Sequence, residues 1–120
     1  MVSSDSRVIM DRIDQAIDNR YLRGDILEAA WLHQEALGGP LEYPILRRAM
    51  MVRYPSLNDK NLKAQIHFLQ DRKLVEEVVN EDLPLELQEM SEGVKLTRAG
   101  KAIVERDADI GGVIISRQGR

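Results

Sequence analysis

Side chains that can contact a nucleic-acid duplex are concentrated in one stretch of this chain, residues 40–74. That stretch carries seven basic and three acidic side chains, a net charge of +4 in a chain whose net charge is -3. Lysine can bond phosphate or guanine, asparagine can form two hydrogen bonds with adenine, and alanine permits close approach to a thymine methyl group. The residues that we expect to contact bases are Lys60, Asn61, Lys63, Ala64 and His67.

Three arginines precede this group and are candidates for phosphate contacts: Arg47, Arg48 and Arg53. Each phosphate that such a side chain neutralises steepens the salt dependence of duplex binding by about 0.9 in a log–log plot. The alternative is that these arginines keep the protein soluble and pair with acidic residues of the first two helices or of the acidic segment described next.

An acidic segment, residues 75–92, follows directly and holds seven acidic side chains and no basic one. Such a segment would repel phosphate, whereas a ribbon that enters a minor groove normally carries Arg or Lys. Its apolar residues suggest instead a surface that docks a basic protein partner, formed by Glu81, Asp82, Leu85, Glu86 and Leu87. The alternative is a loop that folds back over its own core.

No constellation in the chain predicts catalysis. Cysteine is absent, and His33 and His67 stand 34 residues apart without a metal-ligand pattern. The serines lack a nucleophile-elbow pattern, and no glycine-rich phosphate loop is present. We therefore expect a protein that is not an enzyme and that holds no metal or cofactor.

The basic residues fall on two helices expected from the pattern. Asn58 is suited to cap a helix over residues 59–72, in which Leu62, Ile66 and Leu69 form one apolar stripe. Pro44 fits the first turn of a preceding helix that ends near Arg53. Two helices joined by so few residues predict a helix-turn-helix.

The flanking segments predict three strands and further helices. Residues 40–42, 74–79 and 93–96 favour strands, and Thr97 is suited to cap a short final helix. Residues 6–36 favour helix, and we prefer a break at Gly24 because Asp25 can act as an N-cap. One continuous helix remains the alternative, since a single glycine costs about 1 kcal/mol.

Two local motifs resemble those of known proteins. The segment 58–75 resembles the recognition-helix segment of bacterial winged-helix proteins, which closes on leucine-valine before the ribbon called the wing. The segment Leu96-Thr97-Arg98-Ala99-Gly100 is similar to the leucine-threonine-x-x-glycine that follows the wing. Their order, from Tyr21 to Arg117, also resembles a family of small uncharacterised proteins encoded in Mu-like prophages.

The resemblance implies an α+β fold, a winged helix-turn-helix. This chain departs from the family in its long acidic wing and in carrying residues 1–20, which we expect to form an additional N-terminal helix. Residues 107–120 are expected to form a C-terminal tail. It also implies a phage or prophage product, while the family supplies no activity. Together with the basic helices, it predicts a DNA-binding transcriptional regulator. A winged helix that docks a partner in phage replication or assembly through its acidic wing is the alternative.

The 120 residues suit a single domain. No signal peptide or membrane-length apolar run is apparent, which predicts a cytoplasmic protein without membrane contact. Ile9, Ile13 and Ile17 lie on one face of the expected first helix, and the tail contains Val113-Ile114-Ile115. Because a small domain gains stability by burying such surfaces against a second copy, we expect a homodimer. The alternative is that both segments pack on their own domain.

Overall fold

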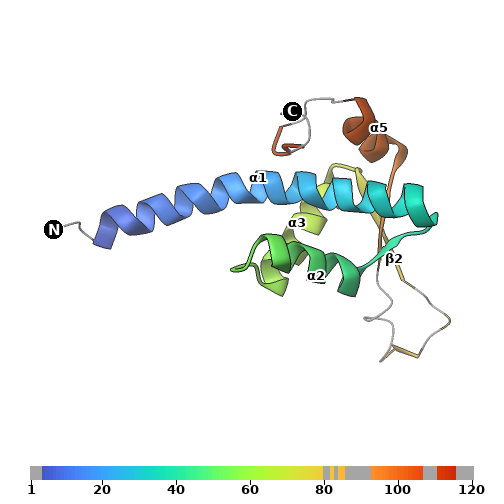
Figure 1. The fold of residues 1–120 in the computed structure, drawn as a ribbon, viewed down its shortest axis with the longest axis horizontal. Coiled ribbons are helices and arrows are strands. Elements are labelled where there is room, and N and C mark those ends of the chain that lie inside the picture. The colour runs from blue at the N-terminus through green and yellow to red at the C-terminus, as the bar shows by residue number, and fades with distance from the viewer. Residues whose placement is uncertain (1–3, 80–81, 83, 86–92, 107–110, 116–120) are drawn as a thin grey trace.

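The computed structural model describes residues 4–79, 82, 84–85, 93–106 and 111–115, with side chains from residue 19 onward. In chain order the elements are α1 (Ser4–Leu37), β1 (Leu41–Glu42), α2 (Tyr43–Arg53), α3 (Asp59–Asp71), β2 (Val75–Val78), β3 (Gly93–Leu96) and α5 (Arg98–Arg106). The expected order of helices and strands is confirmed, and the fold is α+β. Figure 1 shows α1 lying between α2 and α3 on one side and α5 with the C-terminal segment on the other.

The first helix is continuous, so the expected break at Gly24 is wrong. Glycine stands at this position because the C-terminal segment crosses α1 there: a Cβ on Gly24 would lie 1.7 Å from the carbonyl oxygen of Ile114. The amide of Ile114 in turn donates to the Arg20 carbonyl oxygen over 3.1 Å. Asp25 is not a cap but a buried side chain that accepts from Tyr54.

The strands form one antiparallel sheet in the order β1-β3-β2. Leu41 of β1 lies opposite Val94 of β3, and Val75 of β2 lies opposite Leu96 at the other end of β3. All four side chains are buried, whereas Lys95, which points to the other face, is exposed. The sheet therefore has one face in the core, as expected for a small antiparallel sheet.

The core joins every element of the fold. It includes the predicted α3 stripe Leu62, Ile66 and Leu69, each at most 2% exposed. It also includes Val113 and Ile115, which are 6% and 4% exposed. These two tail side chains are thus covered by their own domain, which removes them from the surface available to a second copy.

Two turns connect α3 to the sheet and the sheet to α5. Lys73 has a positive φ of 60°, and hydrogen bonds from Lys73 to Gln70 and from Leu74 to Leu69 end α3 in a Schellman motif. Thr97 Oγ1 accepts from the Gly100 amide over 3.1 Å, which confirms the predicted cap. A Cβ on Gly100 would meet the Leu74 carbonyl oxygen at 2.1 Å, so this position requires glycine.

Within the described residues, no helix combines the length and the apolar character needed to cross a membrane.

Candidate nucleic-acid interface

One row of exposed side chains follows the side of α3 that faces away from the core. Lys60, Ala64, His67 and Asp71 are exposed at spacings of four, three and four residues, which place them on one side of a helix with 3.6 residues per turn. We call these four residues the outer row. Three of the five predicted base contacts, Lys60, Ala64 and His67, lie together in it.

Lys63 is also exposed but lies on the flank of α3 that faces the sheet. Its ammonium group lies 5.4 Å from the centroid of the Tyr43 ring, and it lines a shallow depression together with Glu77 of β2. The aromatic face of Tyr43 attracts the ammonium group and so holds Lys63 beside the first turn of α2. Lys63 is therefore positioned at the edge of the outer row.

Asn61, in contrast, turns toward α1. Its Nδ2 donates to Asn19 Oδ1 over 3.1 Å, and its Oδ1 accepts from Gln65 Nε2 over 2.7 Å. Gln65 is buried and accepts from Arg23 Nε over 2.7 Å. Both ends of the Asn61 amide thus bond side chains within the protein, and the structure does not bring Asn61 together with the outer row.

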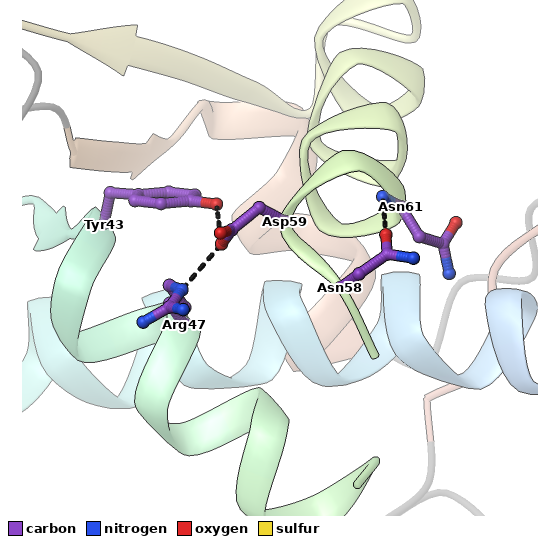
Figure 2. A network of polar contacts seen from close by, with 5 residues as sticks. All are labelled: Tyr43, Arg47, Asn58, Asp59 and Asn61. Atoms are coloured by element: carbon purple, nitrogen blue, oxygen red, sulfur yellow. Dashed lines mark hydrogen bonds and ion pairs between the residues drawn. The ribbon is translucent and has the colours of Figure 1, made fainter. Parts of the chain in front are cut away.

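The junction of α2 and α3 is held by a carboxylate at the start of α3 (Figure 2). Asp59 Oδ1 accepts from Arg47 Nε over 2.6 Å and from the Tyr43 hydroxyl over 3.1 Å. The hydrogen bond from Arg47 is the main reason that the pKa of Asp59 is lowered. Beside it, Asn58 Oδ1 accepts a hydrogen bond from the backbone N–H of Asn61 over 2.8 Å, which confirms the predicted N-cap.

The three candidate phosphate-binding arginines are in different situations. Arg47 forms the ion pair with Asp59, and both side chains are about half exposed. Arg53 Nε lies 3.1 Å from Asp25 Oδ2, whose side chain is only 2% exposed. Arg48 is exposed and takes part in none of the ion pairs found among the described residues. Arg53 thus follows the alternative expectation of pairing with an acidic residue of the first helices, whereas Arg47 pairs with an acidic residue of α3 itself.

Two arginines that the sequence analysis did not single out share one aromatic ring. The guanidinium carbon of Arg23 lies 3.7 Å from the centroid of Phe68, and that of Arg72 lies 4.8 Å from it. Arg72 follows Phe68 by four residues on α3, a spacing that brings side chains together on a helix. Arg23 is 45 residues away in the sequence, so no local pattern could have revealed its position beside them.

The structure describes only part of the acidic segment, residues 75–92. Glu81, Glu86 and Leu87 lie outside the described residues, whereas Asp82 is exposed and Leu85 is 82% exposed. Asp82 and Leu85, the two predicted docking residues that are described, therefore belong to the surface, whereas Val75 at the start of the acidic segment is buried in the core.

Comparisons of the chain with protein-family models, with curated proteins and with solved structures yield no match. Among the described residues, no group of three or more His, Asp or Glu side chains is placed to hold a metal ion.

Proposed function

We propose that this protein is a winged-helix DNA-binding protein, in which α2 and α3 form the helix-turn-helix and β2 and β3 form the base of the wing. Helix α3 is the recognition helix, and its outer row enters the major groove. The observation that carries the proposal is the outer row itself, where Lys60, Ala64 and His67 are all exposed on one side of α3. The resemblance to prophage proteins makes a phage or prophage regulator the corresponding biological role.

The charges around the outer row support this assignment. The two acidic side chains nearest the ends of α3 are Asp59 and Asp71, and Asp59 is neutralised by Arg47. Lys60 and Lys63 remain exposed, so the start of α3 presents net positive charge. In helix-turn-helix proteins the first residues of the recognition helix contact base edges, which is the part of α3 that is most basic here.

The test is a fluorescence-anisotropy titration of duplex DNA, using pooled genomic fragments at low salt. The Ala64→Glu variant places a carboxylate in the middle of the outer row and should lower the affinity at least about tenfold through repulsion from phosphates. Ala99→Glu is the matched control, because Ala99 is an exposed alanine on α5. Equal affinities of the two variants, or no binding by the unaltered chain, would contradict the proposal.

The protein acts as a homodimer in this proposal, and the N-terminal part of α1 joins the two copies. Figure 1 shows the first turns of α1, in blue, extending past the other elements. The sequence places Ile9, Ile13 and Ile17 on one face of this part of the helix. Because the apolar tail packs on its own domain, it supplies no second surface for the dimer.

The alternative, docking of a basic phage protein by the acidic wing, is favoured by one observation. Leu85 is 82% exposed beside the exposed Asp82. A variant with Glu81, Asp82, Glu86 and Glu89 changed to Lys should then lose its partner in a pull-down while keeping its thermal transition. Under the DNA-binding proposal, the same variant should bind duplex DNA more tightly than the unaltered chain.

A further inference from the structure

The guanidinium groups of Arg23 and Arg72 lie 3.7 and 4.8 Å from the centroid of one ring, that of Phe68, without a described acidic partner. None of the ion pairs among the described residues includes Arg23 or Arg72. Like charges near one ring repel, and charged side chains that are partly buried normally have a partner. The arrangement therefore needs a reason that the core packing does not supply.

Arg23 is held in place rather than free to turn toward solvent. Its Nε donates to Gln65 and its NH1 donates to the Gly112 carbonyl oxygen over 3.0 Å. Gly112 has a φ of 86°, and a Cβ there would lie 2.8 Å from Phe68 Cζ and 3.2 Å from Arg23 NH1. Two of the five N–H donors of this guanidinium bond described residues, and the other three have no described partner.

Arg72 adds a second set of donors from the exposed end of α3. Its side chain is exposed and stacks on Phe68, with no hydrogen bond to another described residue. The pKa of Arg23 is lowered by its burial and by the charge of Arg72, and a bound anion would offset both effects. Paired guanidinium forks match the oxygen atoms of a phosphate group in geometry as well as in charge.

We propose that Arg23 and Arg72 bind a phosphate group at the edge of the Phe68 ring, with the ring orienting both guanidinium planes. The site lies on the flank of α3 that faces α1, next to the outer row. Its ligand is thus a backbone phosphate of the duplex whose major groove receives α3. A free phosphate ion shares this chemistry, and only the assignment to DNA rests on the proposed function.

The first experiment tests the site without DNA. In an NMR titration with inorganic phosphate against chloride at equal ionic strength, the Nε–Hε signals of Arg23 and Arg72 should shift together in the unaltered chain. The Arg72→Gln variant should lower the phosphate affinity roughly tenfold, the loss expected for one charge-assisted contact. Arg98→Gln, at an exposed arginine on α5, should leave it unchanged.

The proposal would be overturned if the Nε–Hε signals of Arg23 and Arg72 did not shift when phosphate is added. It would also be overturned if they shift only after Asp107 and Asp109, which stand five and three residues before Gly112 in the sequence, are changed to Asn. In that event the carboxylates of the chain itself would be the occupants.

The second experiment identifies the source of the phosphate. The plot of log affinity for duplex DNA against log salt has a negative slope, whose magnitude should fall by about 0.9 in Arg72→Gln and should not change in Arg98→Gln. Unaltered slopes in both variants, with the phosphate shifts present, would assign the site to free phosphate and overturn its role in DNA binding. If the unaltered chain binds no DNA while the phosphate shifts are present, the proposed function fails and the phosphate site stands.

Discussion

Arg53 and Arg48 look equivalent in the sequence but should respond differently to truncation. Arg53 is bonded to Asp25, whose side chain is 2% exposed, whereas Arg48 is exposed and forms none of the described ion pairs. Removing the partner of a buried carboxylate leaves that charge poorly compensated. The two residues therefore separate a structural role from a role in binding phosphate.

We expect Arg53→Ala to lower the free energy of unfolding by about 1–3 kcal/mol, because Asp25 loses a charged partner while Tyr54 still donates to it. Arg48→Ala should change stability by no more than about 0.5 kcal/mol. Urea denaturation of both variants measures the difference. Equal losses would show that the Arg53–Asp25 pair contributes nothing to the fold.

The ion pair between Arg47 and Asp59 should appear in the pH dependence of stability. The pKa of Asp59 is lowered in the folded protein, chiefly by the hydrogen bond from Arg47. The stabilisation that results is therefore present above the ordinary carboxyl pKa of about 3.9 and is lost as the pH falls through the lower folded value.

The difference in urea midpoint between the unaltered chain and Arg47→Gln should accordingly be present at neutral pH and should disappear in acid. A carboxyl NMR titration of the variant should also show the pKa of Asp59 returning toward its ordinary value. Arg48→Gln is the control, and a pH-dependent difference in that variant would place the effect elsewhere.

At the scale of single elements, α3 ends in a conformation that its residue does not favour. Lys73 occupies the left-handed region, with a φ of 60°, at the position where glycine is usual. An L side chain is strained there by roughly 1 kcal/mol or more, whereas glycine is not.

Lys73→Gly should therefore raise the free energy of unfolding by up to about 1 kcal/mol. Ala64→Gly, on the exposed side of the same helix, should lower it by about the same amount because Ala64 has helical geometry. Thermal denaturation compares the two. A loss of stability in Lys73→Gly would mean that the lysine side chain makes a contact worth more than the strain.

A second prediction at this scale concerns the packing of the C-terminal segment against α1. Gly24→Ala should destabilise the fold by several kcal/mol, since a Cβ would lie 1.7 Å from the Ile114 carbonyl oxygen and backbone would have to shift. Gly39→Ala should be nearly neutral, because nothing lies within 4 Å of that Cβ position. Similar chemical-denaturation midpoints for the two variants would contradict the close approach at Gly24.

These cases show which features could be predicted from the sequence. The cap at Asn58, the cap at Thr97 and the buried stripe of α3 depend on residues within a few positions of one another, and all three are confirmed. The prediction of a helix break at Gly24 was wrong, because a glycine is needed there to admit the carbonyl group of Ile114, which lies 90 residues away in the sequence. Its local signal, a glycine before an aspartate, is the same as that of a helix boundary.

The residues of the candidate site likewise fall into those that local periodicity could place and those that only tertiary packing places. Helical periodicity was sufficient to place Lys60, Ala64 and His67 on one exposed side. It could not show that Asn61 bonds Asn19, since that contact depends on how α3 packs on α1. The pairing of Arg23 with Arg72 on Phe68 likewise follows from tertiary packing alone.

At the scale of the whole molecule, α1 contacts α2 and α3 as well as α5, and its first turns extend beyond these helices (Figure 1). If its first turns join two copies, a chain lacking residues 1–18 should sediment as a monomer while the full chain sediments as a dimer. The shortened chain should keep its core, because the described core begins at Leu22. A full chain that is monomeric at high concentration would contradict the homodimer.

The hydrogen bond from Arg23 to Gly112 joins residues 89 positions apart, and Val113 and Ile115 complete a core that begins at Leu22. During synthesis, α1 therefore leaves the ribosome long before the segment that covers its Gly24 side has been translated. Contacts between such distant residues slow folding, because a large loop must close before they form. Until residue 115 has emerged, the side of α1 at Gly24 therefore lacks the segment that covers it in the folded protein.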